Sequence, residues 1–138
     1  MDWKTLRKKI DDKLKENNAH LSQIDLDELI DFAYHFVTDK DSGMIKVKTH
    51  QIRRFFDAIK KIKLSVDKEE KFENKEKAKL LMLRPQIFNA AKKQGWILKD
   101  LAEITGNWIK KVNNADDFYQ FVNFFESLVA FHQAEARD

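Results

Sequence analysis

The sequence contains no cysteine, which excludes disulfide bonds, thiolate nucleophiles and cysteine metal sites. The absence is also compatible with a reducing cytoplasm. Only one proline and three glycines occur among the 138 residues, too few for the tight chain reversals of a series of β-hairpins. Helices joined by a few loops therefore fit this composition better than strands do.

Long hydrophobic runs are absent as well. Residues 118–125 form an uncharged stretch, but it is far shorter than the roughly 20 apolar residues that span a bilayer. The first ten residues alternate between charged and apolar types and lack the continuous apolar segment of a secretory signal. We therefore expect a soluble, cytoplasmic protein.

The residues that are present indicate a folded helical protein. Hydrophobic residues make up 43% of the chain and charged residues 36%, a balance typical of globular proteins. Apolar residues recur at steps of three and four, which is the spacing of one helix face. We expect an all-α fold, with residues 1–138 forming a single-domain helical bundle of about five to six helices.

The first helices are predicted from their apolar stripes and end signals. Residues 2–16 form an amphipathic helix that Asn17 and Asn18 end. Asp25 and Glu28 have the spacing of a capping box, which would begin a second helix ending near residue 37. Thr49 has the residue type of an N-cap and would begin a third helix, reaching residue 63.

The second half of the chain has its own helix signals. A charged helix is predicted at residues 67–82, and Pro85 suits the first turn of the next helix, which Gly95 would close. Residues 96–112 form a further helical stretch with a break at Gly106, and the last helix opens at Asn113 or Asn114.

The last helix has an unusually wide apolar surface. Phe124 and Phe131 extend its main stripe to one side. The helix is therefore either central to the core or packed against another chain. Because contiguous apolar surface is seldom left in water, we expect self-association, as a homodimer or with further copies, when the chain is isolated.

Charge is segregated along the chain, although the formal net charge is only +3. Residues 45–64 contain seven lysines and arginines and a single acid, and residues 79–99 contain five and no acid. Acids concentrate in residues 25–41 and 116–126. On the third helix the cations lie opposite or beside the apolar stripe, so this distribution favours a polyanionic partner.

No set of catalytic or metal-binding residues assembles in the sequence. The four histidines lack the i, i+4 spacing of a helical zinc site, and the paired carboxylates lie at helix starts, where capping explains them. We therefore expect no enzyme activity, no metal and no cofactor. Most aromatic residues fall on core stripes. For Trp3, Trp96 and Trp108 the sequence leaves two alternatives open, a place in the core or stacking on nucleic-acid bases.

Three sequence blocks together resemble one family. They are VKTHQIRRFFDAIKKI at residues 47–62, LLMLRPQIFNAAKK at residues 80–93 and FYQFVNFFESLVAFH at residues 118–132. Their order and spacing are similar to those of the small helical subunit of type III-A CRISPR effector complexes, the Csm small subunit. The family-like region covers residues 47–132. Gln86 departs from the family pattern, which usually has a basic residue there, and Asn89 departs from a position that tends to small or aromatic residues.

The resemblance implies a non-catalytic, RNA-binding subunit that acts in antiviral defence. It implies partners in the other subunits of the type III-A complex, in further copies of the chain and in the duplex of guide RNA and target RNA. From the basic composition and the resemblance together, we expect the RNA-binding residues to be Lys48, His50, Arg53, Arg54, Lys60, Lys61, Arg84, Lys92 and Lys93.

Two other functions remain open on the residues alone. A helical, sequence-specific DNA-binding regulator would place residues 49–63 in a major groove. A purely structural helical adaptor would carry the same cations as a solvated surface. A footprint on one DNA site would indicate the regulator, and RNA binding that hardly depends on salt would indicate the adaptor.

Overall fold

The computed structural model describes residues 2–16, 18–93 and 98–136. All regular elements of these residues are helical, so the predicted all-α bundle is confirmed. The α-helices are α1 (Trp3–Leu14), α2 (Leu26–Thr38), α3 (Thr49–Glu69), α4 (Asn74–Leu81), α5 (Leu83–Lys93), α6 (Lys99–Ile109) and α7 (Ala115–Glu135). The connections contain the 3₁₀ turns η1 (Leu21–Gln23), η2 (Lys40–Ser42) and η3 (Met44–Lys46).

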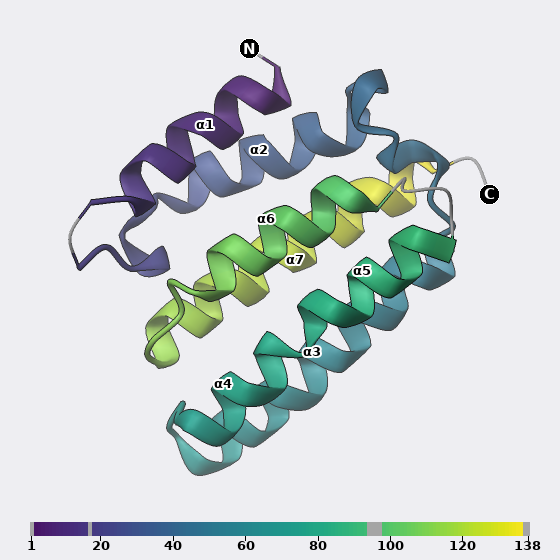
Figure 1. Ribbon diagram of the computed structural model, residues 1–138. Coiled ribbons are helices and arrows are strands. Elements are labelled where there is room, and N and C mark those ends of the chain that lie inside the picture. The colour runs from purple at the N-terminus through teal and green to yellow at the C-terminus, as the bar shows by residue number, and fades with distance from the viewer. Residues whose placement is uncertain (1, 17, 94–97, 137–138) are drawn as a thin grey trace.

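The helices form two layers (Figure 1). In one layer α7 lies between α2 and α3 and packs on both. In the other, α6 lies between α1 and a rod made of α4 and α5, which follow one another with only Met82 between them. If α4 and α5 are counted as this one rod, the described bundle has six helical rods, as predicted. No helix among the described residues has the length and apolar character needed to cross a membrane.

α7 supplies the centre of the hydrophobic core. Phe124 is fully buried, and its ring lies 4.9 Å from that of Trp108 and 5.9 Å from that of Phe32. Phe131 is half-buried and packs edge-on against Tyr34, at 5.3 Å. The alternative that α7 is central to the core is therefore confirmed, and the prediction that Phe124 offers a face to another chain is wrong. Self-association of the isolated chain stays a prediction.

Two of the three tryptophans also belong to the core. Trp3 is 2% exposed and its Nε1 donates to Asp41 at 3.0 Å, whereas Trp108 is fully buried and its Nε1 donates to Asp11 at 2.8 Å. Neither ring is available for stacking on a base. Trp96 lies outside the described residues, as do the predicted helix-ending residues Asn17 and Gly95.

Some predicted helix ends are correct and others are displaced. Asn114 is the N-cap of α7, and its side chain accepts from the backbone N–H of Asp117 at 2.8 Å. Asp25 occupies the N-cap position of α2, but its side chain accepts no capping bond from the described residues. The N-cap of α3 is Lys48, so the prediction of Thr49 is wrong by one residue.

The boundary between the third helix and the charged helix differs from the prediction. α3 continues to Glu69, because Val66 extends its buried stripe and keeps the last turns packed on the core. Glu70 then has a φ of 55°, in the left-handed region that ends helices. α4 begins with a capping box, in which the backbone N–H of Glu73 donates to Glu76 at 3.0 Å.

A buried carboxylate joins η1 to the turn between α6 and α7. Asp117 accepts hydrogen bonds from the backbone N–H groups of Ser22 (2.9 Å) and Asn113 (3.0 Å), and its Oδ2 lies 2.9 Å from Nδ1 of His20. Burial alone would raise the pKa of Asp117, but these hydrogen bonds outweigh it and the pKa is lowered. The ionised form therefore stabilises the fold.

This carboxylate predicts a specific pH dependence of stability. Because its pKa is below the ordinary value of 3.8, the stabilisation is complete above about pH 4 and is lost as pH falls through the lower, folded value. We expect Asp117→Asn to be less stable than wild type at about pH 7 and to lose less further stability on acidification to about pH 2. Urea unfolding followed by circular dichroism would measure both. Equal losses for the two proteins would contradict the assignment.

The same turn anchors α4. Nζ of Lys77 donates to the backbone oxygens of Ile109, at 2.8 Å, and of Val112. Burial lowers the pKa of Lys77, although Asp117 acts in the opposite direction. These bonds satisfy the carbonyl of the last residue of α6 and one carbonyl of the following turn, and they fix the position of α4 beside α6.

Candidate nucleic-acid interface

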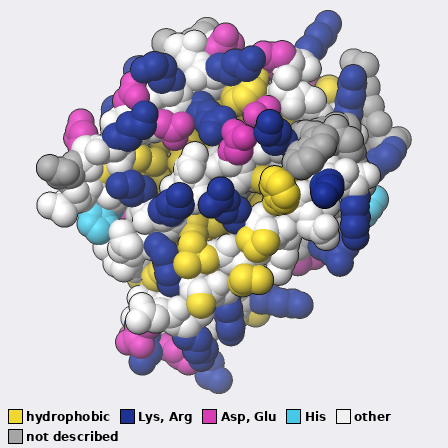
Figure 2. All heavy atoms as spheres, in the orientation of Figure 1, with side chains coloured by type: hydrophobic (Ala, Val, Ile, Leu, Met, Phe, Trp, Pro, Cys, Tyr) yellow, Lys and Arg dark blue, Asp and Glu magenta, His cyan; other side chains and the backbone are white. Residues whose placement is uncertain are grey.

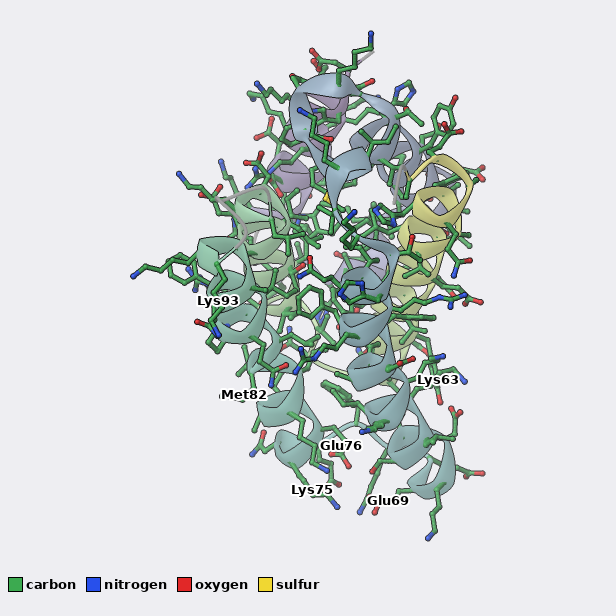
Figure 3. The ribbon with its side chains drawn as sticks, turned by 90° about the vertical axis from the view of Figure 1, so that its right-hand side faces the viewer. Lys63, Glu69, Lys75, Glu76, Met82 and Lys93 are labelled. Atoms are coloured by element: carbon green, nitrogen blue, oxygen red, sulfur yellow. The ribbon has the colours of Figure 1, made fainter. Side chains whose placement is uncertain are left out.

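A groove of about 910 Å³ runs between α3 and the α4–α5 rod. Figure 3 looks towards these two units and shows Met82 and Lys93 on the rod and Lys63 on α3. The residues that line the groove come from both walls and include cations, amides, apolar side chains and one carboxylate, that of Asp57, which forms an ion pair with Lys60 at 3.3 Å. They are Gln51, Arg54, Phe55, Asp57, Ala58, Lys61, Ile62, Lys79, Met82, Leu83, Gln86, Asn89, Ala90 and Lys93.

The groove exists because its two walls pack on different partners. α3 packs mainly on α7, whereas α5 packs mainly on α6. Small side chains, Ala58 from α3 and Ala90 from α5, leave the space between the walls open. The buried side chains of Phe55 and Leu83 give the groove an apolar floor.

Four cations from three helices line the groove. Arg54 and Lys61 come from α3, seven residues apart and therefore on the same side of the helix, with a rise of roughly 10 Å between them. Lys79 comes from α4 and Lys93 from α5. All four are exposed, and none makes an ion pair with a carboxylate of the described residues. Uncommitted cations at such spacing suit phosphate groups.

Arg53 and Lys60 lie outside the groove, although they were predicted to bind RNA together with Arg54 and Lys61. With the Gln133 amide turned so that its oxygen faces α3, both Nη2 and Nε of Arg53 donate to that oxygen at 2.6 Å. Nζ of Lys60 lies 5.0 Å from the centre of the Phe56 ring. Successive helical residues are about 100° apart, so the predicted cationic face divides into two stripes.

The other predicted RNA-binding residues also lie outside the groove. Arg84 packs against α6, where a Cβ at Gly106 would be 2.6 Å from its Cδ. This close approach explains the glycine, and the predicted break at Gly106 is wrong because α6 continues through it. Lys92 is exposed on α5, and Lys48 and His50 are exposed at the start of α3.

Sequence analysis did not single out Lys79 as a site residue. Lys79, Met82, Gln86, Asn89 and Lys93 recur at steps of three and four and form one stripe along the rod. The periodicity was present in the sequence, but it crosses Pro85, where one helix was expected to end and another to begin. The stripe is visible only once α4 and α5 are known to be nearly in line.

Exposed apolar side chains lie beside these cations. Figure 2 shows hydrophobic side chains gathered over α4 and α5, among lysines and arginines. They include Leu81, Met82 and Phe88, which are 43%, 56% and 48% exposed. A surface that combines apolar and cationic groups is typical of a contact surface rather than of a purely solvated one.

The histidines of the described residues have separate local environments. Nε2 of the buried His132 lies 2.8 Å from the backbone oxygen of Val47, and His35 lies 3.8 Å from Asp39. Within the described ranges, no group of three or more His, Asp or Glu side chains is placed to hold a metal ion. His20, His35 and His132 are therefore accounted for by contacts within the fold, whereas His50 is exposed at the start of α3.

Comparison with known proteins gave one match. A family model described as Csm2 Type III-A matches residues 23–138. The matched range contains every residue that lines the groove, and it also includes residues 23–46, which precede the three family-like sequence blocks. No curated protein and no solved structure matched the chain.

Proposed function

Because the chain belongs to the Csm2 family of type III-A CRISPR effector complexes, we propose that it binds the duplex of guide RNA and target RNA. Membership makes it a subunit of the Csm effector complex in type III-A CRISPR defence. The proposed binding surface is the groove between α3 and the α4–α5 rod. In this role the chain acts as a non-catalytic component in the cytoplasm.

The observation that carries the proposal is the convergence of four uncommitted cations on one groove. A polyanion backbone is bound by spaced positive charges, and contacts to phosphates need no base-edge groups. In guide-directed recognition, base pairing reads the sequence and the protein recognises the A-form shape of the duplex. A cationic groove can make these phosphate contacts without reading the base sequence.

Arg54, Lys61, Lys79 and Lys93 are therefore the proposed central contacts. The other residues named from the sequence are proposed as flanking contacts, because they are cationic or titratable and lie outside the groove. These are Lys48, His50, Arg53, Lys60, Arg84 and Lys92.

Other subunits of the effector complex and further copies of this chain complete the proposed set of partners. The exposed apolar side chains of Leu81 and Phe88, which do not line the groove, supply surface for protein contacts beside it. α7 is not part of that surface, since its phenylalanines fill the core.

Binding to unrelated RNA duplexes at several salt concentrations tests the proposed function. We expect wild type to bind two duplexes of different sequence with similar affinity, and the logarithm of affinity to fall by about 0.7–0.9 per phosphate contact for each tenfold rise in salt. A strong preference for one DNA sequence would identify a regulator instead. Affinity that hardly changes with salt would identify a structural adaptor and contradict RNA binding through the groove.

A further inference from the structure

Three amide side chains line the groove together with its cations. Gln51 comes from α3, and Gln86 and Asn89 come from α5. None of their side chains hydrogen-bonds to another described residue, and Oε1 of Gln51 is buried without a donor among those residues. A buried acceptor without a donor is unfavourable, so a ligand that supplies one would bind favourably at this position.

Each wall of the groove carries both amides and cations. Gln51 precedes Arg54 by three residues, and Asn89 precedes Lys93 by four, so these two amides each lie about one helical turn from a cation. Gln86 lies about two turns from Lys79 and from Lys93 on the same rod. A nucleic-acid strand also carries two kinds of group, since a ribose lies between successive phosphates. The groove therefore offers two kinds of group to the two repeating parts of a strand.

The two kinds of group differ in the chemistry that they recognise. Lysine and arginine only donate hydrogen bonds, which suits phosphate oxygens, because these only accept. An amide both donates and accepts, and so does the ribose 2′-hydroxyl. The deoxyribose of DNA lacks this hydroxyl, and contact with it is how a protein distinguishes RNA from DNA at a given site.

We infer that Gln51, Gln86 and Asn89 hydrogen-bond to ribose 2′-hydroxyls of the strand in the groove and so select RNA over DNA. The inference rests on the proposed function. The cations supply affinity for any nucleic-acid backbone, and the amides supply the preference for ribose. The salt dependence of binding and the sugar preference therefore depend on different side chains.

The test compares an RNA duplex with a duplex of the same sequence that carries 2′-fluoro riboses in both strands. Fluorine keeps the A-form geometry of the sugar but donates no hydrogen bond, so shape is held constant. We expect wild type to bind the hydroxyl duplex roughly tenfold more tightly than the fluoro duplex. The double variant Gln86→Met, Asn89→Leu should lose most of this preference while its salt slope stays unchanged.

Two further variants test whether the preference for 2′-hydroxyls depends on the amides of the groove in particular. Asn107→Leu with Asn123→Leu alters two exposed amides on α6 and α7, away from the groove, and should keep the full preference. Gln51→Met alone should reduce the preference in part. Gln86 and Asn89 are exposed, so the double variant should fold like wild type by circular dichroism.

The outcomes distinguish this inference from the proposed function. Equal, salt-dependent binding of the two duplexes by wild type would overturn the role of the amides and leave RNA binding by the cations intact. A preference that survives in the double variant would do the same. Absence of salt-dependent binding to either duplex would overturn both proposals.

Discussion

Replacing Phe124 by alanine is expected to lower the free energy of unfolding by about 3–5 kcal/mol, because the ring is fully buried and the space it leaves is closed by other helices. Trp108 of α6 and Phe32 of α2 contact the ring from two directions. Neither ring can move into the cavity without losing contacts of its own, which are the hydrogen bond from Trp108 to Asp11 and the stacking of Phe32 on Phe36. The cost should therefore approach that of a well-packed core phenylalanine.

Urea unfolding followed by circular dichroism measures this effect, with Leu64→Ala as the control. Leu64 is 70% exposed, so its replacement should change stability by no more than about 0.5 kcal/mol. One outcome would contradict this account and indicate instead that Phe124 of α7 takes part in self-association. That outcome is a Phe124→Ala protein of nearly wild-type stability that sediments as a monomer while wild type sediments as a dimer.

The sequence was sufficient to predict the helices and their buried faces. On α3 the stripe of Ile52, Phe55, Ile59 and Ile62 repeats at steps of three and four, and all four residues are buried. Helical periodicity determines which side of a helix is apolar, because an amphipathic helix must bury that side. The class of fold followed from these stripes and from the scarcity of turn residues.

The sequence was not sufficient to predict the groove. Periodicity places Arg53 and Arg54 on the outer side of α3, but it does not say which helices flank that side. Arg53 contacts Gln133 of α7, and Arg54 lines the groove, as a consequence of packing between distant segments. The role of Gly106 could not be predicted for the same reason, because its close approach to Arg84 exists only after α5 and α6 have packed.

The division of α3 into two cationic stripes leads to the second large effect. Replacing Arg54 and Lys61 by alanine should weaken RNA binding by roughly 25- to 60-fold at about 0.1 M salt, if two phosphate contacts are lost and the affinities converge near 1 M. Replacing Arg53 and Lys60 removes the same residue types and the same charge from the same helix. These two side chains already contact Gln133 and Phe56, so the loss of affinity should be much smaller.

Both variants should remain folded, because all four side chains are exposed and the buried stripe of α3 is unchanged. The two variants therefore have the same net charge, carry their substitutions on the same helix and should have similar stability. What differs between the variants is whether the missing cations line the groove.

Titration of one RNA duplex at several salt concentrations, with wild type and these two variants, tests the central claim most directly. We expect Arg54→Ala with Lys61→Ala to flatten the slope of log affinity against log salt by about 1.4–1.8, and Arg53→Ala with Lys60→Ala, which removes only flanking contacts, to flatten it much less. Equal changes in the two variants, or a larger change on removing Arg53 and Lys60, would contradict the groove as the RNA-binding surface.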